Sequence, residues 1–369
     1  MRHSIRIAGE DIHILMTTIV FAVGIAGGYL AKLVGAPLPM LLGSVTAVGA
    51  ISIFGFRPGG RPPRIPFWLR NFFIPIVGLS IGSAFTPGIL AEMRTWWPSL
   101  LALLFYIPLA HYIGYRTFVM AGRISRTTAY YGAVPGGLLV CIAMGEESGA
   151  DGPMLTALQF LRLILTVMLV PLAFTIMSGT TVGTAAGAVI GHPESGLDPS
   201  EIFWQAALAV AGYFGGRRLG MPAYMITGPI LASGLGHLTG LLVSAPPSWL
   251  IEVTQLVIGV SLGTRFVGMG GSTFFKAFWL ALLNIVFTMI LAICMGFLLH
   301  NIVDERIEAV VLAFAPGGLA EMSLVAVSLQ ISVIYVSAHH IARIMLSVTF
   351  AKLFSRLIPP ENEPGPAYR

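Results

Sequence analysis

The sequence predicts an all-α polytopic membrane protein built from two tandem repeats, and three observations support this fold class. The 369-residue chain is 56% hydrophobic and only 10% charged, with a mean hydropathy of +0.85, whereas a soluble domain carries about 25% charged residues. Apolar runs of roughly twenty residues, the length that crosses a bilayer, follow one another along the chain. Several short motifs also occur twice, in the same order.

The apolar runs are expected to be helices, because a bilayer admits only helices and closed barrels, and these runs are too long for barrel strands. They cover residues 12–34, 38–55, 67–86, 98–120, 126–147, 152–178, 202–219, 223–243, 249–268, 277–299, 307–330 and 333–355. We therefore expect about 10–13 transmembrane segments, since one run could be re-entrant and the small residues at 180–190 could add a short crossing.

The runs define the expected organisation of the chain. It comprises an N-terminal cytoplasmic segment (1–11), a first membrane repeat (12–178), a linker (179–201), a second membrane repeat (202–356) and a polar tail (357–369).

Two motifs establish the repeat. The frame Gly-x-Pro-x-x-Met-x-x-Gly occurs at residues 35–43 and again at 220–228, and Gly-x-Ser-x-Gly occurs at 78–82 and at 259–263. From the second motif onward the two halves match at a constant offset of 181 residues. The basic loops of both halves lie on the cytoplasmic side only if the second half is inverted, so the sequence favours inverted repeats.

A third duplicated motif predicts one broken helix per repeat. Pro135-Gly136-Gly137 and Pro316-Gly317-Gly318 each interrupt an apolar run near its middle. Proline removes a backbone donor and glycine frees the backbone, so the helix is expected to stop there. Duplicated interruptions at membrane depth point to a transporter's binding site, where helix ends face an ion or substrate. The simpler alternative is a pair of kinks or tight turns.

Two arginines are expected to lie beside these breaks. Arg162 and Arg343 match one another between the halves, and each sits well inside an apolar run. A charge at membrane depth costs at least about 2.5–3.5 kcal/mol, so each guanidinium must face the protein interior. Each arginine binds or couples to a substrate anion, or else it is structural and neutralises the carbonyl end of a broken helix or pairs with a carboxylate.

Three further polar residues complete the candidate substrate-binding set. Glu321 follows the second break, where the first half has Val140 instead, and it could carry a proton or pair with Arg343. His340 occupies the position that matches Gln159. A histidine there could relay protons, or it could be a packed, hydrogen-bonded residue.

The sequence supports no catalytic, cofactor or metal site. Both Gly-x-Ser-x-Gly copies lie in predicted membrane helices, not in the strand-to-helix turn that a hydrolase nucleophile requires. The eight histidines are scattered, and only His339 and His340 are adjacent. Basic residues lie in short loops, which argues against direct nucleic-acid binding. The expected partners are a small-molecule or ion substrate and the lipid bilayer, and a homo-oligomer is left open.

The duplicated segments resemble the bacterial membrane AbrB family. They are GAPLPMLLG (35–43), GMPAYMITGPILASGLGH (220–237), AVPGGL (133–138) and FAPGGLAEMS (314–323), and the resemblance spans roughly residues 14–356. It implies an internal duplication, an inner-membrane location, and kinship with cation–proton antiporters and anion transporters that use crossed broken helices. The acidic pair of sodium–proton antiporters is missing, since Gln159 and Arg162 stand where an aspartate would be expected.

Together these observations predict a secondary transporter or permease for a small solute, with an organic anion favoured by the buried arginines and a midplane site between the broken helices. One alternative is a membrane regulator that alters gene expression indirectly, a label that family members carry. A second is a membrane enzyme, after the family's ammonia monooxygenase label, which the residues do not support.

Overall fold

A computed structural model describes residues 4–7, 10–36, 38–57, 60, 62–178 and 199–357. The segment expected as a linker and the end of the polar tail lie largely outside these residues. The elements are β1 (Ser4–Ile7), β2 (Glu10–His13), α1 (Ile14–Leu33), α2 (Pro39–Ile53), α3 (Phe67–Gly82), α4 (Pro87–Glu92), η2 (Met93–Thr95), α5 (Trp97–Met120), α6 (Arg126–Ala133), α7 (Leu138–Glu147), α8 (Gly152–Ser178), α9 (Pro199–Arg218), α10 (Tyr224–Leu238), α11 (Ser248–Gly263), η4 (Thr264–Phe266), α12 (Gly271–Val303), α13 (Ile307–Phe314), α14 (Leu319–Ser328), α15 (Val333–Phe354) and η5 (Ser355–Leu357).

Each of the twelve predicted runs contains a long helix or a broken pair. The fifth run is divided into α6 and α7, and the eleventh into α13 and α14. Three pairs of corresponding long helices also have equal lengths: α1 and α9 have 20 residues, α2 and α10 have 15, and α3 and α11 have 16. The short helices follow the same rule, with 8 residues in α6 and α13 and 10 in α7 and α14.

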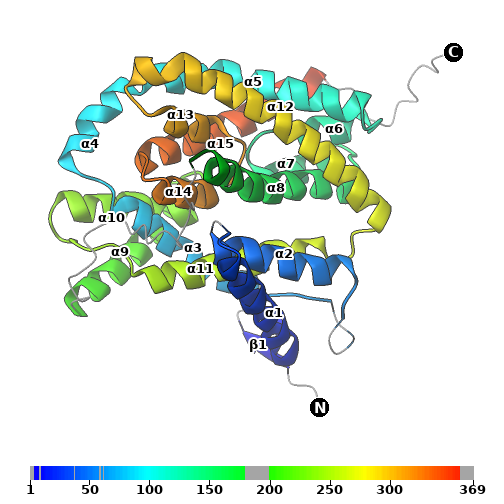
Figure 1. The fold of residues 1–369 in the computed structure, drawn as a ribbon, viewed down its shortest axis with the longest axis horizontal. Coiled ribbons are helices and arrows are strands. Elements are labelled where there is room, and N and C mark those ends of the chain that lie inside the picture. The colour runs from blue at the N-terminus through cyan, green and yellow to red at the C-terminus, as the bar shows by residue number, and fades with distance from the viewer. Residues whose placement is uncertain are drawn as a thin grey trace. The chain divides into compact units, whose positions relative to one another are not determined.

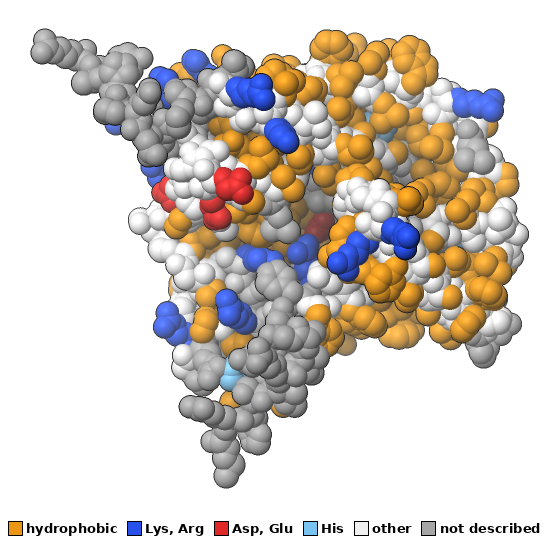
Figure 2. Space-filling view, turned by 180° about the vertical axis from the view of Figure 1, so that it is seen from behind, with side chains coloured by type: hydrophobic (Ala, Val, Ile, Leu, Met, Phe, Trp, Pro, Cys, Tyr) orange, Lys and Arg blue, Asp and Glu red, His pale blue; other side chains and the backbone are white. Residues whose placement is uncertain are grey.

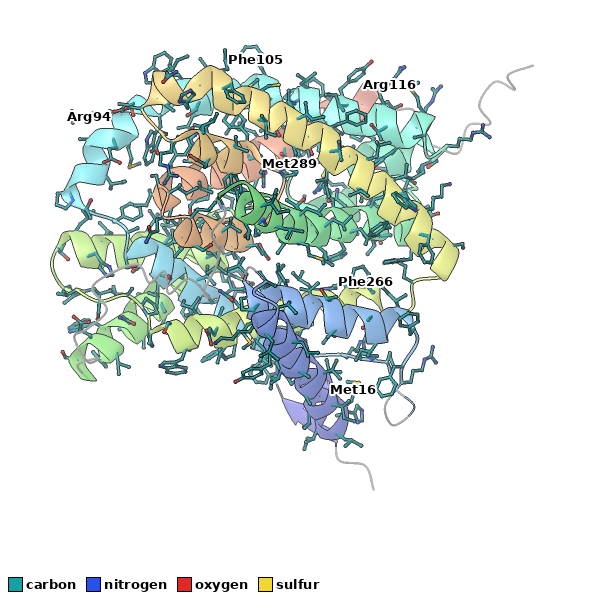
Figure 3. The ribbon with its side chains drawn as sticks, viewed as in Figure 1. Met16, Arg94, Phe105, Arg116, Phe266 and Met289 are labelled. Carbon is teal, nitrogen blue, oxygen red and sulfur yellow. The ribbon has the colours of Figure 1, made fainter. Side chains whose placement is uncertain are left out.

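Five of the described helices, α1, α5, α8, α12 and α15, are long and apolar enough to cross a bilayer, and the pair α3–α4, bent by 82°, would make a sixth. Figure 2 shows hydrophobic side chains spread widely over the visible surface. Phe105 on α5, labelled in Figure 3, is 75% exposed. Apolar groups in this number on the outside are suited to lipid, and the chain has the character of a multi-pass membrane protein.

The β-strands among the described residues lie at the N-terminus. Strands β1 and β2 pair antiparallel, with Ser4 opposite His13 and Ile7 opposite Glu10. The sequence Ser-Ile-Arg-Ile alternates polar and branched apolar residues, which is the period of a strand. Most of this hairpin lies in the segment expected as the N-terminal cytoplasmic segment (1–11), for which no strand was predicted.

The described chain divides into two compact units that cut across the sequence halves (Figure 1). The first unit comprises Met1–Met93, Val167–Gly268 and Ala320–Ser337, and the second comprises Arg94–Thr166, Met269–Leu319 and Ala338–Arg369. The first unit therefore contains α1–α3 together with their counterparts α9–α11. The second contains α5, α6 and α7 together with α12 and α13. The unit boundaries fall inside α8, α14 and α15.

Packing inside the first unit repeats itself at the level of single contacts. A Cβ atom on Gly78 of α3 would lie 2.7 Å from the Ile226 carbonyl oxygen of α10. A Cβ atom on the matching Gly259 of α11 would lie 2.6 Å from the Leu41 carbonyl oxygen of α2. Only glycine permits backbones to approach this closely. The two contacts use matching residues of both halves, so α3–α10 and α11–α2 are equivalent pairs.

The helices of these pairs begin in the same unusual way. The residue before α2 is Leu38, with φ of 44°, and the residue before α10 is Ala223, with φ of 48°. Left-handed backbone is uncommon for residues with a Cβ atom and costs about 1–2 kcal/mol. Both residues occupy the fourth position of the duplicated Gly-x-Pro-x-x-Met-x-x-Gly frame, so the frame encodes a specific helix start as well as small residues for packing.

Candidate functional site

The first break lies in the second unit, between α6 and α7. Helix α6 ends at Ala133, and α7 begins at Leu138 after the segment Val134–Gly137. Gly137 has φ of 69°, a left-handed conformation that favours glycine, and no side chain caps the start of α7. Helix α13 ends at Phe314 in the same manner, before the second break. The predicted interruptions are therefore complete breaks between short helices rather than kinks.

Arg162 and Arg343 lie beside the carbonyl ends of the two short helices. Arg162 on α8 donates from Nη1 to the Val134 carbonyl, and Arg343 on α15 donates from Nη1 to the Ala315 carbonyl. Arg343 also donates from Nη2 to the Gly317 carbonyl. A cation at a helix C-terminus satisfies carbonyl groups that have no intrahelical partner and opposes the helix dipole. The structural role considered for the arginines is thus present in both halves.

Gln159 and His340 orient these arginines through matching hydrogen bonds. The Gln159 amide donates to the Tyr131 carbonyl at 2.6 Å and accepts from Arg162 at 2.8 Å. His340 Nε2 lies 3.0 Å from the Leu312 carbonyl, and its Nδ1 lies 2.9 Å from Arg343 Nη2.

A carbonyl can only accept, and a guanidinium can only donate. The network therefore assigns the proton of the His340 ring to Nε2 and makes Nδ1 an acceptor. The neutral imidazole does what the glutamine amide does in the other half. This geometry supports the hydrogen-bonded role for His340, because a second proton on Nδ1 would face the N–H groups of the guanidinium.

The two arginines form a concentration of buried positive charge. Arg162 is 6% exposed and Arg343 is 1% exposed, and they are near enough to interact electrostatically. Lys32–Glu252 and Arg306–Glu308 are ion pairs, and both are partly exposed. The arginines are thus held by neutral acceptors, and their positive charge is not balanced by a paired carboxylate in the described chain.

Glu321 interacts with groups other than the two arginines. It lies in the first turn of α14 and is 5% exposed. It belongs to the first unit, where it interacts electrostatically with Arg70 of α3. Its carboxylate also accepts a hydrogen bond from its own backbone N–H group. All other residues of the predicted site fall in the second unit.

Sequence analysis missed three residues that contact the breaks. The Tyr106 hydroxyl of α5 donates to the Phe314 carbonyl at 2.7 Å, and the Cys141 thiol donates to the Gly136 carbonyl at 3.2 Å. Ser347 of α15 packs against Gly136. None of the three has an identical counterpart in the other half, so the repeat, which selected the other residues, could not select these. Their polar groups within apolar runs were the remaining signal.

The histidines next to the second break are engaged in hydrogen bonds. His339, adjacent to His340, directs Nε2 to the Ser99 hydroxyl at 2.8 Å. Within the described residues, no group of three or more histidine, cysteine, aspartate or glutamate side chains could hold a metal ion.

Comparison with known proteins finds relatives over most of the chain. A family model described as "Transition state regulatory protein AbrB" matches residues 55–359. A Bacillus subtilis (strain 168) protein, YhjN, described as uncharacterized, is 26% identical over 376 aligned residues, which cover 95% of this chain and 94% of YhjN. An Escherichia coli (strain K12) protein, whose name describes it as a candidate regulator, AbrB, is 26% identical over 301 residues, or 81% of this chain and 83% of that protein. The chain belongs to the AbrB family.

Proposed function

We propose that this protein is a secondary transporter that carries a small anion across the bacterial inner membrane without converting it chemically. The observation that carries the proposal is the pair Arg162 and Arg343. Both guanidinium groups are buried beside helix breaks and are held by carbonyl, amide and imidazole acceptors. Charged groups at membrane depth are costly and mark substrate or ion pathways.

The arrangement of the breaks supports the same function. Interrupted helices offer carbonyl and N–H ends at membrane depth, which transporters use to bind charged solutes between inverted repeats. An entering anion would balance the charge of the two arginines, and its departure would leave them with neutral partners only. We propose inverted halves here because the basic loops of the sequence favour that orientation.

A thermal-shift screen of the purified protein in detergent tests this function. The panel contains organic acids, inorganic anions, amines and metal ions, because a ligand that binds only the folded state raises its apparent melting temperature. We expect stabilisation by one class of anion, followed by uptake of that anion into proteoliposomes. A protein stabilised by amines or metal ions and by no anion would contradict the proposal.

Two substitutions and a control connect the result to the arginines. Arg343→Gln removes the charge and retains an N–H donor for the break carbonyls, and Arg162→Gln does the same in the first half. Both should abolish uptake while the protein still inserts. Lys352→Ala removes an exposed cation from the same helix as Arg343 and should transport normally. Uptake unchanged in both glutamine variants would refute the assignment.

The name of the Escherichia coli relative supports an indirect regulatory role as the alternative. A transporter alters gene expression when its substrate is a signal. The two proposed functions therefore differ in whether regulation of gene expression requires transport. A strain that lacks the gene is complemented with wild type or with Arg343→Gln. If the inactive variant restores normal expression, regulation is independent of transport and becomes the better description.

A further inference from the structure

Ser347 breaks the correspondence between the two halves. It lies on α15, four residues after Arg343, and matches Thr166 on α8. Thr166 directs its hydroxyl to the Arg162 carbonyl at 2.7 Å, the usual bond of a hydroxyl in a helix. Ser347 is 1% exposed, and its Oγ has no hydrogen-bond partner among the described residues. A buried hydroxyl without a partner is costly, and therefore calls for an explanation.

The Ser347 hydroxyl is directed at the first break. A Cβ atom on Gly136 would lie 3.1 Å from Ser347 Oγ, and one on Gly137 would clash with Val348 Cγ2. Helix α15 thus packs on the backbone immediately before α7. The Ser347 hydroxyl is therefore an unused donor at the start of α7. Arg343 lies one turn earlier on α15, where it donates to the carbonyls of the second break.

The starts of α7 and α14 differ in charge. Helix α14 has Glu321 in its first turn, whose carboxylate accepts from the backbone there. Helix α7 has no acidic residue in its first turn and no capping side chain, and the residue that matches Glu321 is Val140. The N–H groups of a helix start and its dipole favour an anion. The Glu321 carboxylate is such an anion at the start of α14, and the start of α7 has no equivalent side chain.

We propose that the first break holds the transported anion, a small oxyanion such as a carboxylate, between the start of α7 and the Ser347 hydroxyl. The site is one-sided: Glu321 occupies the equivalent position at α14, so one anion binds per chain. The proposal rests on the proposed function and adds the place, the stoichiometry and the role of Ser347.

The test measures anion binding to the purified full-length protein by isothermal titration calorimetry. The probes are acetate, succinate and inorganic phosphate, with ionic strength balanced by chloride. Val140→Glu places a carboxylate where α14 carries Glu321, on a side chain that is 46% exposed and therefore able to change. We expect it to abolish binding, whereas Val140→Gln, of the same shape without the charge, should retain it.

Ser347→Ala removes one hydroxyl and should weaken binding by about tenfold, the value of one hydrogen bond to a charged group. Thr166→Ala, the matched control, should bind as wild type does, because its hydroxyl already has a backbone partner. Apparent melting temperatures without probe establish that each variant is folded.

The outcomes separate this inference from the proposed function. If wild type binds a probe and Arg343→Gln loses it, but Val140→Glu and Ser347→Ala bind normally, the anion site lies elsewhere and transport of an anion stands. A stoichiometry of two anions per chain would also overturn the one-sided site. If wild type neither binds nor transports any of the anions, both the inference and the proposed function are wrong.

Discussion

Replacing His340 with glutamine is the sharpest test of how the two halves correspond. The structure makes the imidazole equivalent to the Gln159 amide, because each accepts from an arginine and donates to a carbonyl three residues before the break. A glutamine at position 340 can reproduce both bonds. We therefore expect His340→Gln to fold and to retain its apparent melting temperature within the error of measurement.

The magnitude follows from what His340→Ala removes. That substitution leaves the Leu312 carbonyl without the His340 donor and removes one acceptor of Arg343. A buried polar group left without a partner costs about 1–3 kcal/mol, so the two losses together amount to roughly 2–6 kcal/mol. The His340→Gln variant should avoid most of this cost. The informative quantity is the difference in free energy of unfolding between His340→Gln and His340→Ala.

The assay is thermal denaturation in detergent, followed by the fluorescence of a thiol-reactive or intrinsic probe, at several pH values between 5 and 8. The reciprocal pair, Gln159→His and Gln159→Ala, provides the matched control in the other half. If His340→Gln destabilises as much as His340→Ala, the imidazole does more than satisfy two hydrogen bonds. If His340→Gln folds normally but loses transport, a proton on the ring is needed for function, and the proton-relay interpretation returns.

Two further predictions concern the packing of helices. Gly212→Ala should destabilise the protein by about 1–3 kcal/mol, because its Cβ atom would lie 2.7 Å from the backbone of α10. Gly215→Ala, on the same helix with open space around it, should be neutral or slightly stabilising. Equal melting temperatures of the two variants would refute the close approach of Gly212 to α10. Tyr106→Phe should cost about 1–3 kcal/mol by leaving the last carbonyl of α13 without this donor. Tyr112→Phe, on an exposed tyrosine of the same helix, should change little in the same denaturation assay.

The helices themselves were predictable from sequence because the bilayer restricts the choice. Long apolar runs must be helical, and the constant offset between halves located the breaks at Pro135–Gly137 and Pro316–Gly318. The position of Arg162 and Arg343 beside the breaks followed from the same offset and from the cost of a buried charge. What each guanidinium bonds to required coordinates, since carbonyl groups leave no trace in a sequence.

The association of the helices could not be predicted from their periodicity. Gly78 and Gly259 suggested close packing of small residues, but nothing in the pattern says that α3 contacts α10 or that α11 contacts α2. The unmatched residues were hidden for a different reason. Ser347 and Tyr106 look like ordinary polar residues in an apolar run, and their importance depends on which backbone groups lie across from them.

Helices of one half pair with helices of the other, α3 with α10 and α11 with α2. This pairing has a consequence both for synthesis on the ribosome and for the evolution of the gene. Helices α2 and α3 are synthesised before α11 and α10, so the surfaces of α2 and α3 that contact those helices stay uncovered until then. A gene that encoded only one half would meet the same difficulty, and a second copy of itself would be the natural solution. The duplicated glycine contacts are what a symmetric pair of ancestral chains would leave behind after fusion.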